Sequence, residues 1–168
     1  MNQLKRYLII GTIFVIILGT LSHFFYDWSN NSFVVGFFSP VNESTWEHMK
    51  LVFFPMLLFS LFANSKLKSI YPCITSSLLF GILIGTFLIP IFFYTYTGIL
   101  GYNVFILDLI TFILAVICAF FSVYRLTLSC RMQNHTTILF IAVCVVFVCF
   151  VLFTVYPPSI ALFTTFTN

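Results

Sequence analysis

Charged residues are scarce in this chain. Its 168 residues include only four Asp or Glu and seven Lys or Arg, 7% in all, against roughly 25% in typical soluble domains. The sequence also lacks a phosphate-binding loop, a Gly-x-Ser-x-Gly nucleophile turn and a His-Glu-x-x-His zinc motif. These absences exclude a soluble domain and give no support to nucleotide chemistry or to the common hydrolase motifs.

Long apolar runs occupy most of the chain, in which 61% of residues are hydrophobic and 24 are Phe. A helix needs about 20 apolar residues to cross a bilayer, and five runs qualify, near residues 7–25, 46–63, 73–94, 104–128 and 137–156. They lack the alternation of barrel strands, and the first is too long for a signal peptide. We therefore predict an all-α transmembrane helix bundle, a single integral membrane domain over residues 1–168, in the cell (plasma) membrane with the lipid bilayer around it.

The few charges are sorted by loop. Six of the seven Lys and Arg residues precede the first run, lie between the second and third, or flank the connection between the fourth and fifth. All four acids, Asp27, Glu43, Glu47 and Asp108, fall at the opposite ends of the runs. Because short cytoplasmic loops are enriched in Lys and Arg, we predict an N-terminus inside and a C-terminus outside. The net charge of +3 then indicates topology, and no nucleic-acid partner is expected.

The connection over residues 27–45 is unusually long and has two parts. Its start is polar and prone to turns, whereas residues 33–38 are apolar. We expect the apolar part to be a short interfacial helix, a re-entrant segment or a mobile loop among the headgroups. At its end, Ser44 and Glu47 have capping-box spacing, in which Ser44 accepts a backbone N–H and Glu47 reaches back. Asn42 is a competing cap.

Titratable side chains gather near the predicted outer ends of three spans. The candidates for ligand or proton binding are His23, Glu43, Glu47, His48, Lys50 and Asp108. Ionisable groups at membrane depth are costly unless paired or hydrated, so each is a functional candidate. Helical spacing places Glu43, Glu47 and Lys50 on one face, with His48 about 100° away.

Asp108 has only apolar neighbours in the sequence. It therefore needs a partner across the bundle, and we expect Lys50, His23 or the face of Glu43 and Glu47 to supply it. A purely structural pair with Lys50 is the alternative.

The five cysteines do not predict a disulfide framework. Cys118, Cys144 and Cys149 fall inside predicted spans, and Cys73 and Cys130 near predicted inner ends. An odd number in apolar surroundings favours buried free thiols.

Three functional classes remain open. The favoured one is small-solute or cation binding or transport, as a carrier or substrate-binding subunit with an outward-facing cavity lined by acids and histidines. The second is a metal-dependent or acid/base-dependent hydrolase or transferase acting on a lipid-like substrate. The third is a non-catalytic membrane partner. His23, His48, Glu47 and Asp108 offer the N and O donors of a divalent metal site, although no paired-His motif encodes one.

The residues Gly81 and Gly85 form a small-xxx-small pattern in the third run. Such a pattern lets two helix backbones approach closely. We expect it to serve packing within the chain, with a homo-oligomer or another membrane protein as the alternative partner.

The segment from Pro40 to Lys50 reads Pro-Val-Asn-Glu-Ser-Thr-Trp-Glu-His-Met-Lys, and a Tyr-Pro-Pro follows at 156–158. Both resemble the pattern P-V-N-E-S-x-W-E-H-x-K and the later Y-P-P of a family of small bacterial multi-pass membrane proteins, a domain of unknown function. The resemblance covers most of the chain and implies no activity. It makes motif positions of Asn42, Glu43, Ser44, Trp46, Glu47, His48 and Lys50. The polar tail that follows Y-P-P in that family is reduced here to residues 159–168, expected along the outer interface.

Overall fold

The computed structural model describes residues 2–165 and confirms the predicted fold class. Five of the described helices are long and apolar enough to cross a membrane: α1 (Gln3–Ser22), α4 (Thr45–Leu67), α5 (Ile74–Leu100), α6 (Phe105–Ser129) and α7 (Thr136–Val155). The predicted bounds differ most for α5, which continues six residues further, and by four residues at the start of α1 and at the end of α4. Gly101 ends α5 in the left-handed conformation, with a φ of 81°, that a helix C-terminus commonly requires.

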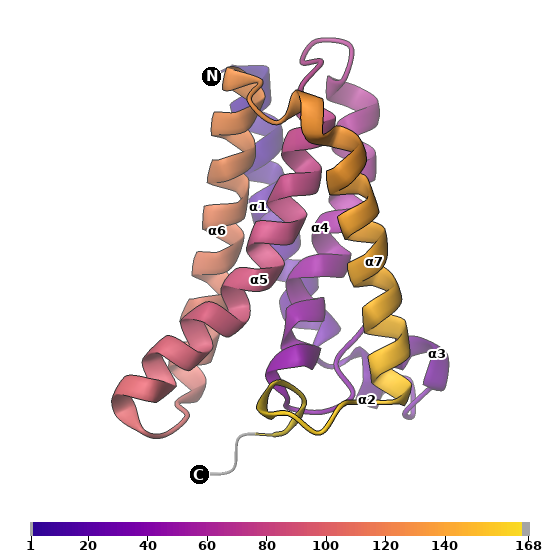
Figure 1. Cartoon of the computed structure of the whole chain (residues 1–168), viewed down its shortest axis with the longest axis vertical. Helices are drawn as coiled ribbons and strands as arrows, with labels where there is room; N and C mark the ends of the chain where they lie inside the picture. The colour runs from indigo at the N-terminus through magenta and orange to yellow at the C-terminus, as the bar shows by residue number, and fades with distance from the viewer. Residues whose placement is uncertain (1, 166–168) are drawn as a thin grey trace.

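The long helices run up and down, so that each connection lies at one of two ends of the bundle (Figure 1). The N-terminus and the links over residues 68–73 and 130–135 share one end, which we call the basic end because six of the seven cations lie in or near it. The other end, the acidic end, carries α2 (Phe25–Trp28), α3 (Phe33–Gly36), the turn over residues 101–104 and all four acids. The prediction from the sequence, that the acids and most of the cations lie at opposite ends of the bundle, is therefore confirmed.

The apolar part of the long connection begins with the short helix α3, so its conformation is helical as in the first of the expectations for it. The chain after α7 includes a short turn, η2 (Ala161–Phe163), which lies against the start of α4. Ring contacts join Phe163 to Trp46, 4.8 Å between centroids, and a β-bridge joins Thr165 to Ser44. Residues 159–165 thus cover the acidic end, and the rest of the predicted interfacial tail lies outside the described residues.

The small-xxx-small pattern packs α5 against its neighbours within the chain. A Cβ at Gly81 would lie 2.4 Å from Val123 and 2.8 Å from Met56, and one at Gly85 would lie 2.9 Å from Ala119. These contacts come from α4 and α6, so the expectation of packing within the chain is confirmed. The same packing leaves the glycines no room for the seam of a homodimer.

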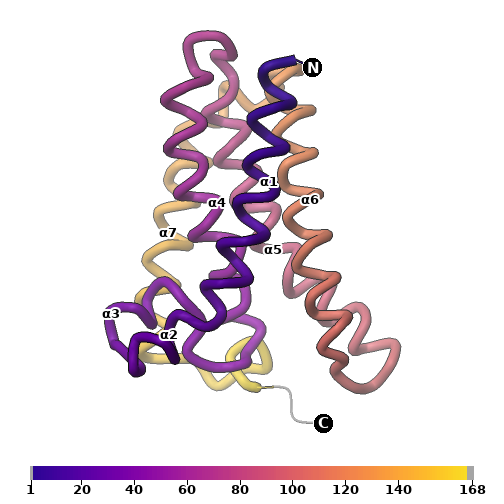
Figure 2. Tube along the Cα trace, turned by 180° about the vertical axis from the view of Figure 1, so that it is seen from behind, coloured from indigo at the N-terminus to yellow at the C-terminus, as the bar shows by residue number. Residues whose placement is uncertain are grey.

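The lower half of α5 and the start of α6 swing away from the rest of the bundle, which gives the acidic end a wedge shape (Figures 1 and 2). Towards the basic end, α1 packs tightly against α4 and α6. A Cβ at Gly11 of α1 would lie 2.4 Å from Phe59 of α4 and 2.7 Å from Phe120 of α6. The contact of α1 with α4 and α6 is therefore close in that half, although a cavity of about 450 Å³ lies there between α4, α5 and α7.

A disulfide joins Cys73 and Cys130 at the basic end, with 5.3 Å between their Cα atoms. The expectation of free thiols is therefore wrong for these two residues, whereas Cys118, Cys144 and Cys149 are free. The bond ties the start of α5 to the end of α6, two points 57 residues apart in sequence. No local spacing pattern encodes such a pair, because antiparallel packing of α5 and α6 brings the two thiols together.

Candidate metal centre

Local structure at the acidic end brings His23, Glu43 and His48 together. His23 caps the C-terminus of α1, and His48 lies in the first turn of α4. Glu43 precedes the helix: the Ser44 hydroxyl accepts the N–H of Glu47 at 3.4 Å, and the Asn42 side chain accepts the N–H of Ser44 at 2.9 Å. These two caps start α4 at Thr45 and leave Glu43 in the connection, where its side chain can turn back over the helix.

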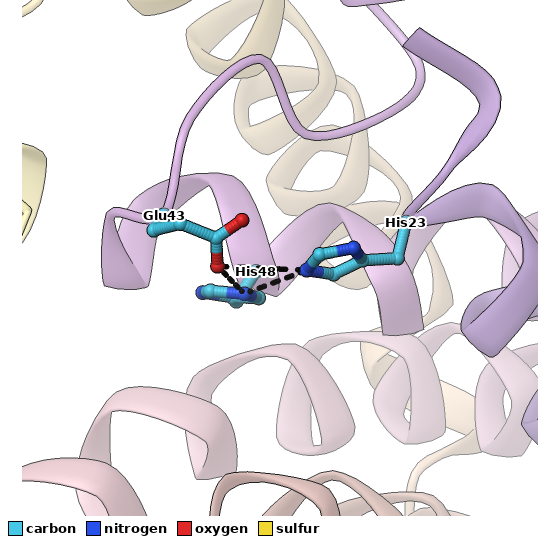
Figure 3. Close-up of side chains that lie close together, drawn as sticks. All are labelled: His23, Glu43 and His48. Carbon is cyan, nitrogen blue, oxygen red and sulfur yellow. Dashed lines mark hydrogen bonds and ion pairs between the residues drawn. The ribbon is translucent and has the colours of Figure 1, made fainter. Parts of the chain in front are cut away.

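The three side chains present one atom each to a common point (Figure 3). The Nε2 atoms of His23 and His48 are 3.4 Å apart. Oε2 of Glu43 lies 3.5 Å from Nε2 of His23 and 3.3 Å from Nε2 of His48. The imidazole rings stack with centroids 5.4 Å apart. Two nitrogens and one oxygen therefore form a nearly equilateral triangle.

This triangle has the dimensions of one face of a tetrahedral metal site. Zinc binds His nitrogen and carboxylate oxygen at about 2.0–2.2 Å, so neighbouring ligand atoms of a tetrahedron lie about 3.3–3.5 Å apart. The three measured separations are 3.4, 3.5 and 3.3 Å. An ion about 0.7 Å out of the plane of the three atoms would lie about 2.1 Å from each of them. The separations of the three donor atoms therefore suit a single ion.

The three residues also perturb one another's proton equilibria. The hydrogen bond with Glu43 raises the pKa of His23, against the opposing effect of burial, and the charges of Glu43 and Asp27 add to the rise. The hydrogen bonds from His23 and His48 hold the pKa of Glu43 well below its usual range. Glu43 is therefore anionic at physiological pH. Its side chain is 68% exposed, so solvent screening weakens these interactions.

A cavity of about 440 Å³ lies beside the triangle. Its lining combines polar residues with aliphatic and aromatic ones from α1, α4, α5 and α6. The lining residues are Thr20, His23, Phe24, Glu43, His48, Leu51, Ile89, Phe93, Phe105, Asp108, Leu109, Thr111 and Phe112. An ion held by the three ligands would have this space for a fourth ligand, the arrangement found in catalytic rather than structural zinc sites.

Asp108 faces the bundle as expected but has a different partner. It lines the cavity together with His23, Glu43 and His48, and the Tyr96 hydroxyl of α5 donates a hydrogen bond to Oδ1 of Asp108. Lys50, the other expected partner, forms its ion pair elsewhere. Tyr96 was not among the sequence candidates, because aromatic residues near a membrane boundary are common for other reasons.

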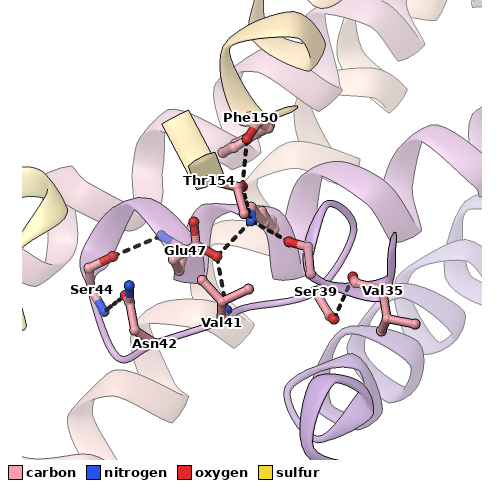
Figure 4. Close-up of polar contacts among 10 residues, drawn as sticks. Val35, Ser39, Val41, Asn42, Ser44, Glu47, Phe150 and Thr154 are labelled. Atoms are coloured by element: carbon pink, nitrogen blue, oxygen red, sulfur yellow. Dashed lines mark hydrogen bonds and ion pairs between the residues drawn. The ribbon is translucent and has the colours of Figure 1, made fainter. Parts of the chain in front are cut away.

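Glu47 and Lys50 form a second, separate cluster (Figure 4). The Lys50 ammonium is fully buried and donates to Oε2 of Glu47 at 2.6 Å, to the Gly36 carbonyl at 2.9 Å and to the Thr154 hydroxyl at 2.7 Å. Glu47 also accepts the N–H of Val41 at 3.0 Å and does not reach back to Ser44. All three ammonium donors are used, so Lys50 ties α3 and α7 to α4.

The predicted common face is right for Glu47 and Lys50, which pair across one turn of α4, and wrong for Glu43. Helical spacing does not apply to Glu43, because α4 begins after Ser44. Glu47 was also a candidate metal ligand, yet its Oε2 is engaged by Lys50 and Val41. Glu43 takes that place beside the two histidines. Trp46, a motif position, packs its ring against Phe150, Phe153 and Phe163, which fixes the C-terminal segment on α4.

The match to a family model extends over the whole chain, residues 1–168. The chain belongs to the family of unknown function DUF6512. This membership agrees with the resemblance drawn from the Pro40–Lys50 segment and supplies no activity. No curated protein and no solved structure matches the chain at a significant level. Function must therefore be inferred from the site itself.

Proposed function

We propose that this DUF6512 protein binds a divalent transition-metal ion through His23, Glu43 and His48 at the acidic end of its membrane bundle. One observation carries the proposal: the three donor atoms are separated by 3.3–3.5 Å, the edge lengths of a tetrahedral zinc site. A ligand set of imidazole and carboxylate, without sulfur, suits zinc among the available first-row ions.

The packing favours retention of the ion over passage through the bundle. On the side of the site that faces the basic end, Gly19 of α1 lies close to its neighbours: a Cβ there would be 2.5 Å from the Leu51 carbonyl and 2.6 Å from Phe112. The tight contact of Gly11 with Phe59 and Phe120 follows about two helical turns further towards the basic end. Cation binding is therefore the part of the favoured functional class that this conformation supports.

A metal-dependent hydrolase or transferase is the second candidate, and a specific observation favours it. Three protein ligands beside a cavity leave a fourth position for water or substrate, and a metal there lowers the pKa of bound water to about 7. Asp108, which lines the same cavity, is the candidate for proton transfer. This activity would be established if the zinc-loaded protein hydrolyses a lipid-like ester and the Asp108→Asn variant, with zinc still bound, does not.

Metal analysis of the purified full-length protein tests the metal site. After zinc loading and removal of free ion, we expect one zinc per chain, and we expect His48→Ala to abolish it. His135→Ala is the matched control, because His135 lies in the link at the basic end, far from the site along the bundle. Zinc binding that is absent in the native protein, or equal in the native and His48→Ala proteins, would contradict the proposal.

The acidic end, and with it the site, is proposed to face the outside of the cell. The distribution of Lys and Arg over the connections supports this orientation. Tyr102 is exposed in the turn at the acidic end and Lys68 is exposed at the basic end. In intact cells, an impermeant maleimide should label Tyr102→Cys and not Lys68→Cys, and the opposite pattern would reverse the orientation.

A further inference from the structure

The cavity beside the metal centre is largely a hydrocarbon-lined space. Its apolar surface comes mainly from Phe24, Leu51, Ile89, Phe93, Phe105 and Phe112. Its volume of about 440 Å³ lies within the range of about 300–1,000 Å³ of small-molecule sites. A hydrated ion or a small polar solute would leave most of this apolar surface in contact with water. The lining therefore suits a ligand with a hydrocarbon part.

The cavity is open at the side, between α1 and α6. The two helices touch where Gly19 meets Phe112, and they diverge from there towards the acidic end (Figure 2). Beyond this contact the lining side chains are accessible, with Phe24 45% and Phe105 79% exposed. Both helices belong to membrane spans. With these spans in a bilayer, the space between the end of α1 and the start of α6 would give an apolar molecule a lateral path to the cavity.

The charge at the metal favours an anionic head group. A divalent ion bound by one carboxylate and two neutral imidazoles retains one positive charge. Asp108, the other acid of the cavity, accepts a hydrogen bond from the neutral Tyr96 hydroxyl. That bond does not cancel the charge of a carboxylate, so it is the metal itself that attracts an anionic head group. The open coordination position is therefore best filled by a negatively charged oxygen, which hard and borderline metals bind well.

We propose that the cavity binds a single-chain amphiphile whose oxyanion head, a carboxylate or a phosphate, occupies the fourth position on the metal while its hydrocarbon chain lies along the Phe-lined wall. This inference rests on the proposed metal site, since the metal holds the head. It adds the chemical class of the ligand, and it identifies the lateral opening between α1 and α6 as the route of entry.

A series of unbranched carboxylates tests the proposal on zinc-loaded, full-length protein in neutral phosphatidylcholine nanodiscs. Affinity is measured by equilibrium dialysis and referred to the free aqueous ligand, with empty nanodiscs as the blank. Each methylene buried should tighten binding by about fourfold from butanoate to decanoate. Decanol should bind much more weakly than decanoate, because it lacks the oxyanion. Decyl phosphate compared with decanoate shows which of the two heads is preferred.

Two variants of α6 serve as a matched pair. Leu109→Trp places a larger ring in the cavity wall and should reduce decanoate binding by at least tenfold while zinc content stays at the native value. Leu114→Trp is the control, because Leu114 is exposed on the same helix to a similar degree, 45% against 41%, and does not line this cavity. Its affinity for decanoate should equal that of the native protein.

The outcomes separate this proposal from the metal site. One bound zinc without chain-length dependence, or with equal affinity for decanol and decanoate, would overturn the amphiphile proposal and leave the metal site standing. Equal losses in Leu109→Trp and Leu114→Trp would overturn it as well. Absence of bound zinc would overturn both, and decanoate binding that survives removal of zinc would refute the role of the metal in holding the head.

Discussion

Replacement of Glu43 by Gln is the sharpest perturbation of the proposed centre. The substitution keeps the shape of the side chain and removes the one anionic ligand. Since the Glu43 side chain is 68% exposed and outside the long helices, the fold should not depend on it. Any effect on zinc-dependent stability therefore reports on metal binding.

The expected size follows from linkage. Zinc at 100 times its dissociation constant stabilises the native state by about 2.7 kcal/mol, which corresponds to about 5–11 °C in melting temperature for a chain of this length. Loss of an outer-shell partner alone weakens metal sites by about 10–100-fold, so loss of a direct ligand should cost at least about 100-fold. At the same zinc concentration the stabilisation then falls to about 0.4 kcal/mol, or about 1–2 °C.

The assay is thermal unfolding in detergent with and without zinc, followed by the fluorescence of the protein. Asp27→Asn is the matched control, because it removes an exposed acid near the same histidine without removing a donor of the triangle. We expect the zinc-induced shift to survive in Asp27→Asn and to collapse in Glu43→Gln. Equal shifts in the native protein and in Glu43→Gln would refute the assignment of Glu43 as a ligand.

Three further results are expected. Without metal, the raised pKa of His23 adds stability that is complete below about pH 6.5 and is lost as the pH rises through the folded-state pKa. The lowered pKa of Glu43 adds stability that is complete above about pH 4.5 and is lost as the pH falls. Thermal melts should therefore peak between these limits without metal, whereas zinc-loaded protein should gain stability with rising pH because zinc displaces protons; parallel profiles would contradict this. Lys50→Ala leaves the buried Glu47 carboxylate uncompensated and should lower the free energy of unfolding by about 3–5 kcal/mol. The control Lys66→Ala, at an exposed lysine, should lower it by at most about 0.5 kcal/mol. Similar losses in the two variants would show that Lys50 does not hold the acidic end together. Cys73→Ser removes the disulfide that closes a loop of 57 residues and should lower the free energy of unfolding by up to about 4 kcal/mol. Reductant should destabilise the native protein by a similar amount and leave the variant unchanged. If reductant still destabilises the variant, the effect of reductant does not come from this disulfide.

Several features of the fold were predictable because they depend on local sequence. Runs of roughly 20 predominantly apolar residues are long enough for a helix to cross a bilayer. The five spans could therefore be located from the sequence, and most of their ends were placed to within a few residues. Ser44 and Asn42 lie within three residues of the backbone N–H groups that they accept, and the start of α4 was therefore readable from the capping residues. The sorting of charges between the two ends followed from the alternation of the helices.

The partners of the polar residues were not predictable in the same way. Glu43 and Glu47 are four residues apart, yet one binds two histidines and the other a buried lysine, because the helix begins between them. Asp108 accepts a hydrogen bond from Tyr96 because α5 and α6 are consecutive antiparallel helices, which brings the two residues together. The disulfide, likewise, requires knowledge of which helix ends are adjacent.

The sequence by itself determined that this chain is a membrane bundle with its titratable groups at one end, since hydrophobicity and capping act between near neighbours. Only the tertiary structure decided which of those groups form a site. The triangle of His23, Glu43 and His48 joins the end of one helix, a connection and the start of another. Its edges of 3.3–3.5 Å depend on the angle at which α1 and α4 pack, a property of side-chain volumes throughout the core that no local pattern encodes.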